Sequence, residues 1–78
     1  MDIKLKNKDN EIIVVPLSNL SITEDNGTII IKNTFQLIGY YEILPPVKSL
    51  QAILDRINEG FVKLENTVDL SGLLKPKQ

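Results

Sequence analysis

Residues 45–60, PPVKSLQAILDRINEG, decide the fold class because the hydrophobic period changes there. The apolar residues of this stretch recur at spacings of three, four and one, which is typical of one face of an α-helix. They are Val47, Leu50, Ile53, Leu54 and Ile57. Ser49 is well placed as the N-cap, and Gly60 is well placed to end the helix in the left-handed conformation. We therefore predict one short helix over about residues 49–59.

The sequence before Pro45 has a period of two, which predicts strands. Pro16 cannot donate a ladder hydrogen bond, so it indicates the end of a strand or an edge position. Asn26-Gly27 is the clearest hairpin turn in the chain, because both residues tolerate a positive φ. Gly39 lies within the last of these segments and indicates a bulge or a close backbone approach. The expected strands lie within residues 3–6, 11–17, 20–23, 28–32 and 35–44.

After the helix, residues 61–70 (FVKLENTVDL) return to strand character. They predict two short strands around residues 65–67, followed by a loose tail over residues 75–78. The whole pattern predicts an α+β fold, a small and mostly antiparallel β-sheet of five or six strands with one short α-helix. At 78 residues the chain has room for one core, so we expect a single small domain over residues 1–78.

The composition excludes several classes of function. Cys and His are both absent, which removes disulfides, thiolate zinc sites, cysteine nucleophiles and the commonest general base. We therefore expect no enzyme, no metal, no cofactor and no small-molecule substrate. The longest uninterrupted apolar runs have four residues, and the first eight residues lack the apolar segment of a signal peptide. We expect no membrane association and a cytoplasmic location.

The apolar residues are unusual in kind. Ile, Leu and Val make up 27 of the 78 residues, against four aromatic residues. A domain of this size buries only about 60% of its unfolded surface. Such a core gives modest stability unless further surface is buried against another chain, so we expect a partner.

The basic residues include a stripe on the first predicted strand. Lys4, Lys6 and Lys8 share one face of it at a period of two. The stripe is either a contact for nucleic acid or another anion, or a set of edge lysines that prevents aggregation. We favour the second interpretation, because the net charge is −1 and Arg56 is the sole arginine, the preferred reader of guanine.

Aromatic residues are the candidates for a protein interface. Tyr40 and Tyr41 point to opposite faces of a regular strand, so one should lie in the core and the other should be exposed. An exposed tyrosine near Phe35 is either a contact anchor or a single surface aromatic.

The order of these segments is similar to that of the LytTR-type DNA-binding domain of bacterial response regulators. Leu20-Ser21-Ile22-Thr23-Glu24 resembles the family's early strand, Ser49-Leu50 resembles the start of its helix, and residues 61–70 resemble its next stretch. The resemblance covers roughly residues 11–75 and the first two thirds of the family's domain. It implies a similar fold and an open sheet edge, which favours pairing with another chain.

The chain also departs from the LytTR pattern where that family contacts DNA. The family has Arg, His, Arg and Asn at positions that correspond to Lys63, Glu65, Asn66 and Asp69. Two of the four are acidic here, which opposes binding to phosphates. Our first hypothesis is therefore a non-enzymatic regulatory protein that forms a homodimer or binds another protein. The alternative is a compact DNA-binding regulator that uses Lys63, Asn66 and the lysine stripe.

Overall fold

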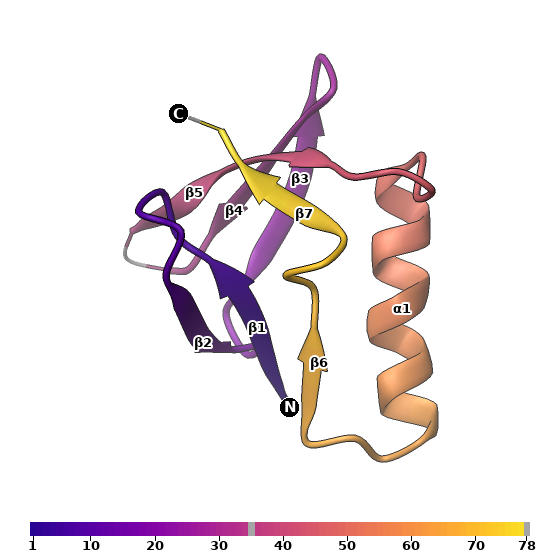
Figure 1. The fold of residues 1–78 in the computed structure, drawn as a ribbon. Helices are drawn as coiled ribbons and strands as arrows, with labels where there is room; N and C mark the ends of the chain where they lie inside the picture. Colours follow the sequence, from indigo (N-terminus) through magenta and orange to yellow (C-terminus); the bar gives the residue numbers. More distant parts are fainter. Residues whose placement is uncertain (35, 78) are drawn as a thin grey trace.

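The computed structural model describes residues 1–34 and 36–77, and it contains two β-sheets and one α-helix (Figure 1). The predicted α+β class is confirmed. In chain order the elements are β1 (Asp2–Lys6), β2 (Ile12–Pro16), β3 (Ser21–Asp25), β4 (Thr28–Lys32), β5 (Leu37–Ile43), α1 (Leu50–Val62), β6 (Thr67–Asp69) and β7 (Leu74–Pro76).

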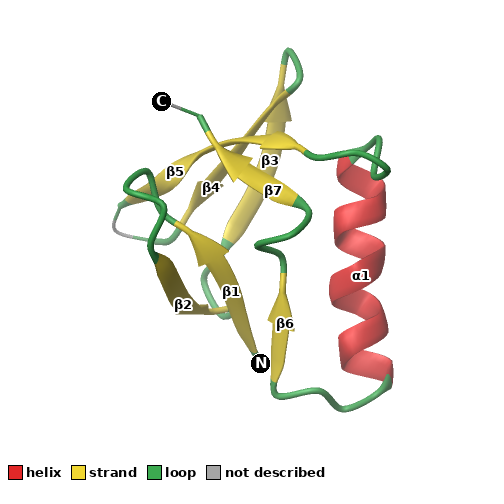
Figure 2. Cartoon of the chain, in the orientation of Figure 1, coloured by secondary structure: helices red, strands yellow, loops and turns green. Residues whose placement is uncertain are grey.

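The first sheet has the order β2-β1-β6, and the second has the order β3-β4-β5-β7. All neighbouring strands are antiparallel except β1 and β6, which are parallel. The helix lies along one side of the molecule, next to β6 (Figure 2). Both sheets and the helix contribute to one cluster of buried side chains.

The core is built from alternate strand residues and the inner face of the helix. Each strand turns every second side chain inward, as the period of two predicts. Among the described residues, Tyr41 is the one aromatic residue of this core, and the other members are aliphatic. The buried hydrophobic residues are Ile3, Leu5, Ile29, Ile31, Tyr41, Ile53, Ile57, Val68, Leu70 and Leu74.

The start of α1 agrees with the sequence. Ser49 is the N-cap, and its hydroxyl oxygen accepts a hydrogen bond of 3.2 Å from the backbone N–H of Ala52. The predicted end at residue 59 is wrong, because the helix continues to Val62 and Gly60 lies inside it. Gly60 is buried, and a Cβ atom there would lie 2.5 Å from Cγ2 of Val68. This glycine therefore allows the helix to approach β6 closely.

The helix ends in a Schellman motif in which Leu64 takes the left-handed position. Leu64 has a φ of 57°, and its N–H donates to the carbonyl of Phe61 over 3.2 Å. The next N–H, of Glu65, donates to the carbonyl of Gly60 over 2.9 Å. Residues 61–64 are therefore not a strand, which corrects the prediction of two strands over residues 61–70. Only Thr67–Asp69 forms one.

The turn and glycine predictions in the strand region are confirmed. Asn26 and Gly27 connect β3 to β4 with φ values of 50° and 83°. The pairing of β4 with β5 shifts between Ile31 and Lys32, beside the partner Gly39, which marks a bulge. A Cβ at Gly39 would also lie 3.1 Å from Cε2 of Tyr41, so the tyrosine ring packs over the bare backbone of this glycine.

The predicted loose tail over residues 75–78 needs correction. Lys75 and Pro76 belong to β7, which pairs with β5. The N–H of Lys77 donates to the carbonyl of Tyr40 over 2.8 Å. Residues 75–77 are thus tied to the second sheet.

Candidate functional site

The two sheets have four outer strands, and three of them are protected against pairing with another chain. β6 has three residues and lies next to α1, β7 carries Lys75 and Pro76, and β3 ends in Glu24 and Asp25. Short strands, charges, proline and a covering helix are the usual protections of sheet edges. β2 lacks a charge and a covering strand within the described residues, and only Pro16 at its end interrupts it.

The backbone of β2 presents a row of hydrogen-bonding groups on its open side. The N–H of Asn7 donates to the carbonyl of Glu11, and the N–H of Leu17 donates to the carbonyl of Met1. Because antiparallel pairing alternates, the odd-numbered residues of β2 bond to β1. The N–H groups of Ile12 and Val14, and the carbonyls of these two residues and Pro16, therefore face away from β1.

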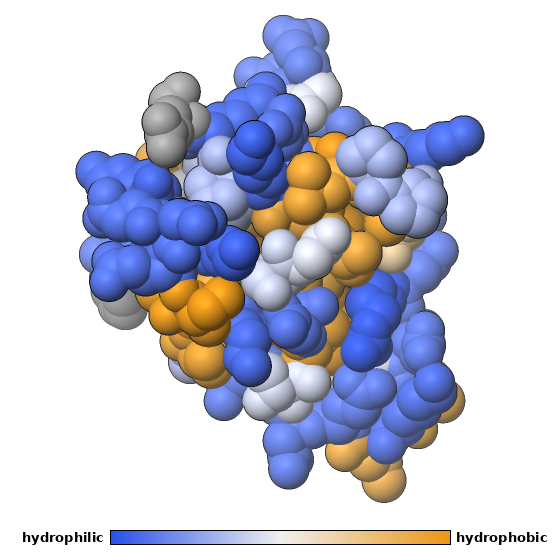
Figure 3. Space-filling model, in the orientation of Figure 1, coloured by the Kyte–Doolittle hydropathy of each residue, from blue (hydrophilic) through white to orange (hydrophobic). Residues whose placement is uncertain are grey.

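The side chains on the same residues are apolar and exposed. Ile12 is 51% and Val14 is 53% exposed. In the register of the sheet, Ile12 lies opposite Lys6 and Val14 lies opposite Lys4. Figure 3 shows an apolar patch in the region of β2, next to hydrophilic surface. We call the open backbone row together with Ile12, Val14 and Pro16 the β2 edge.

The predicted anion-contact residues are not brought into one basic surface. Lys4 and Lys6 share the outer face of β1, and Lys8 lies in the following turn. Lys63 caps the far end of α1 and forms an ion pair of 2.7 Å with Glu59. The pairing raises the pKa of Lys63, first through the hydrogen bond to Glu59 and then through its charge.

Asp69 and Asn66 also lie close to β1. The N–H of Asp2 donates to the carbonyl of Asn66, and Lys4 is paired with Asp69 in the parallel register. The pKa of Asp69 is lowered mainly because the hydroxyl and the N–H of Ser71 donate to its carboxylate over 2.6 and 2.8 Å. The charge of Lys4 lowers it further. The carboxylate of Asp69 therefore lies beside Lys4, on the surface where the DNA-binding alternative would place phosphates.

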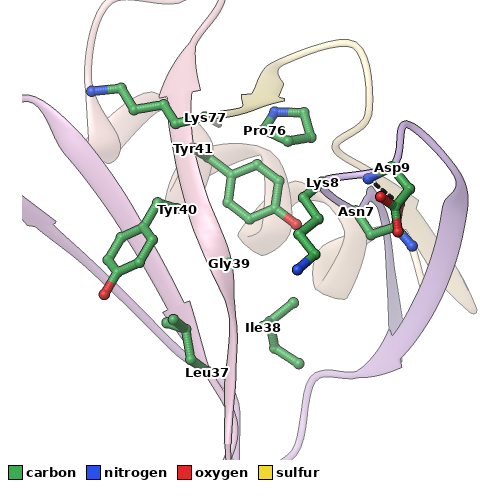
Figure 4. Close-up of a pocket in the computed structure, with 10 residues that line it drawn as sticks. All are labelled: Asn7, Lys8, Asp9, Leu37, Ile38, Gly39, Tyr40, Tyr41, Pro76 and Lys77. Atoms are coloured by element: carbon green, nitrogen blue, oxygen red, sulfur yellow. Dashed lines mark hydrogen bonds between the residues drawn. The ribbon is translucent and has the colours of Figure 1, made fainter.

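The two tyrosines point to opposite sides of β5, as predicted (Figure 4). Tyr41 is buried, so its candidacy as an interface residue is wrong, while Tyr40 is 48% exposed. Phe35, the third candidate of that group, lies outside the described residues. The hydroxyl of Tyr41 donates to the carbonyl of Lys6 over 2.8 Å. This carbonyl lies beyond the last residue of β1 that pairs with β6, so Tyr41 supplies the partner that β6 does not reach.

A cleft of about 420 Å³ lies between the turn after β1 and strands β5 and β7 (Figure 4). It is lined by residues 7–9, 37–41 and 76–77. Its ionisable side chains are Lys8, Asp9, Lys77 and the two tyrosines. This set lacks an activated nucleophile with an adjacent base, which is the arrangement that covalent catalysis needs.

A second exposed apolar group lies at the end of α1, and the sequence did not reveal it. Phe61, Val62 and Leu64 are all more than half exposed, and Leu64 reaches 88%. The sequence predicts a short strand for these residues. The helical period continues through Ile57 and Phe61, and this signal could have distinguished a longer helix from a strand here.

The only arginine of the chain joins α1 to the loop before β6. Nη2 of Arg56 lies 3.1 Å from Oε2 of Glu65, and the two side chains are about one third exposed. The other terminal nitrogen, Nη1, is buried and has no hydrogen-bond partner in the part of the chain that the structure describes. Arg56 is thus occupied by a structural ion pair beside the core.

Within residues 1–34 and 36–77, no group of three or more His, Cys, Asp or Glu side chains is arranged to hold a metal ion. The same residues contain no helix that is long and apolar enough to cross a membrane. Comparison with protein-family models, with curated proteins and with solved structures gave no match. The resemblance to LytTR-type domains stays a prediction.

Proposed function

We propose that this chain is a small, non-enzymatic, cytoplasmic regulatory protein that acts by contact with another protein chain, and that the β2 edge is its contact surface. The observation that supports this most is the contrast between the four outer strands. Three are short, covered or charged, whereas Ile12–Pro16 is uncharged and exposes apolar side chains. Natural sheets rarely leave such an edge unprotected unless it is used.

The chemistry of the β2 edge fits an added β-strand. A partner strand would satisfy the open N–H and carbonyl groups of Ile12 and Val14, and its side chains would cover the exposed faces of these two residues. In this mode of recognition the main-chain hydrogen bonds provide affinity and the alternate side chains provide specificity. Neither a metal nor a cofactor is needed for it.

The DNA-binding alternative has less support. Lys63 is paired with Glu59, and Lys4 is accompanied by Asp69. A protein that binds duplex DNA gains most of its affinity from cations that are free to neutralise phosphates. Lys6 and Lys8 remain for this role, and two lysines give a weak and strongly salt-dependent interaction.

A lysine at the β2 edge should abolish the contact. In Val14→Lys a charge would be placed at the centre of the β2 edge, facing the added strand, while stability should fall by about 1 kcal/mol, because the site is exposed but the new charge lies opposite Lys4. We expect the wild-type chain in an extract of the producing cells to elute from a size-exclusion column above the mass of a monomer. Val14→Lys should elute as a monomer.

Thr23→Lys is the matched control, because it places the same exposed charge on the outer strand β3. This variant should elute like the wild-type chain. A wild-type chain that elutes as a monomer, or an equal shift in both variants, would contradict the proposed function.

A further inference from the structure

We infer that the chain that docks on the β2 edge is a second copy of this chain, with the two β2 strands antiparallel about a twofold axis at Val14. This inference rests on the proposed function and names its partner. The result is one continuous sheet of six strands, in the order β6-β1-β2-β2-β1-β6. The symmetry is that of an isologous dimer, in which the same patch serves both partners.

The hydrogen-bonding groups of the β2 edge match themselves in this register. Val14 lies opposite Val14 of the second copy, and each N–H can donate to the carbonyl of the other. Ile12 lies opposite Pro16 of the second copy, so the N–H of Ile12 can donate to the proline carbonyl. Proline has no N–H to return, so the carbonyl of Ile12 loses the inner bond of this outer pair on each side, and the two strands must diverge around the proline rings.

The side chains and charges are also compatible with this symmetry. Strand β2 carries no charge from Ile12 to Pro16, so the two copies meet without opposed like charges. On the outer face, the row of Lys6 and Ile12 continues into Pro16 and Asp2 of the second copy, so the opposite charges of Lys6 and Asp2 lie three strand spacings apart, about 14 Å. The two Lys4 residues flank the two Val14 residues at the same separation. That distance exceeds the Debye length of about 8 Å at physiological salt, so neither the attraction nor the repulsion is large.

The pairing is short, which sets its strength. A two-stranded contact of five residues is marginal in water, and here it gains only the cover over Ile12 and Val14. We therefore expect a dimer that forms reversibly as the concentration rises.

The natural absence of cysteine allows a direct test by cross-linking of single-cysteine variants. In Val14→Cys the two introduced residues would have Cα atoms about 5.5 Å apart, within the range that a disulfide bridges. In Ile12→Cys they would be displaced by four residues along the strands, about 14 Å, which is too far. The two positions lie on the same face and are equally exposed, so Ile12→Cys is the matched control.

Purified variants oxidised with diamide and separated on a denaturing gel should give a covalent dimer for Val14→Cys. Its yield should rise with protein concentration and exceed that of Ile12→Cys at least about fivefold. Equal yields, a higher yield for Ile12→Cys, or no dimer from either variant would overturn the inference. If neither cysteine variant gives a dimer but Val14→Lys elutes as a monomer in the extract while the wild-type chain elutes above that mass, the β2 edge binds a different protein. Only this inference then fails. If that difference in elution is also absent, both proposals fail.

Discussion

Replacement of Tyr41 by alanine should lower the free energy of unfolding by about 3–5 kcal/mol, the range for loss of a buried aromatic side chain. Tyr41 is 1% exposed and is the single aromatic residue in the buried core of residues 1–34 and 36–77. A domain of 78 residues has a total stability of roughly 4–12 kcal/mol. We expect Tyr41→Ala to unfold at a much lower urea concentration than the wild-type chain, as measured by circular dichroism.

Tyr41→Phe separates the hydroxyl from the ring. It keeps the packing over Gly39 but leaves the carbonyl of Lys6 without the hydrogen bond of 2.8 Å. The expected loss is about 0.5–1.5 kcal/mol, the usual net value of one hydrogen bond. A loss as large as that of Tyr41→Ala would contradict the assignment of most of the effect to the ring.

The stabilities of the wild-type chain and Tyr41→Phe should respond differently to high pH. Burial raises the pKa of Tyr41 above its ordinary value of 10.0. The contribution of the neutral Tyr41 hydroxyl to stability is therefore fully present below about pH 10. It is lost as the pH rises through the folded-state pKa of Tyr41. The stability difference between the wild-type chain and Tyr41→Phe should shrink over that range.

Gly60→Ala should destabilise the chain by about 1–2 kcal/mol, although alanine is the better helix former. The new Cβ would lie 2.5 Å from Cγ2 of Val68 and 3.1 Å from Cε of Met1. Overpacking of this kind costs about 1–3 kcal/mol, and the gain in helix propensity returns at most about 1 kcal/mol. Urea unfolding of the two proteins measures the difference.

Gly72→Ala is the control for Gly60→Ala, because nothing lies within 4 Å of the Cβ position at Gly72. It should change stability by less than about 0.5 kcal/mol. In a Val68→Ala background, Gly60→Ala should cost less than in the wild-type chain, since the clashing methyl group is gone. A stabilising effect of Gly60→Ala in the wild-type chain would show that the helix and β6 are not in close contact.

The strand region and the start of the helix could be predicted because their signals are local. The alternation of Ile3 and Leu5, the Asn26-Gly27 turn and the Ser49 cap each depend on residues a few positions apart. The end of the helix depends on distant residues. Gly60 is read locally as a terminator, and only the approach of Val68 shows why a glycine is needed inside the helix.

Leu64 and the last strand were missed for related reasons. A leucine in the left-handed conformation breaks the local preference for glycine at the end of a helix, so the sequence could not indicate the Schellman motif there. Lys75-Pro76 looks like a tail in the sequence, and it becomes a strand because β5 offers a partner for it. Long-range pairing decides such short segments.

The candidate site was anticipated only in outline. The resemblance to LytTR-type domains implied an open sheet edge, and Pro16 indicated the end of a strand or an edge position, but the interface candidates were the aromatic residues. Tyr41 is instead required by the core, and the apolar surface lies at Ile12 and Val14. Their exposure depends on which strand is outermost, and strand order was not readable from the sequence.

The most direct measurement is the amide hydrogen exchange of Ile12 and Val14 in the purified protein at low and high concentration. Their N–H groups point to the open side of β2, so exchange should be fast in the monomer and should slow as the strands pair. The N–H of Glu24 faces the open side of β3, by the same alternation from the Asn26-Gly27 turn, and it should exchange at an unchanged rate. Fast exchange of Ile12 and Val14 at every concentration would contradict pairing of two copies at the β2 edge.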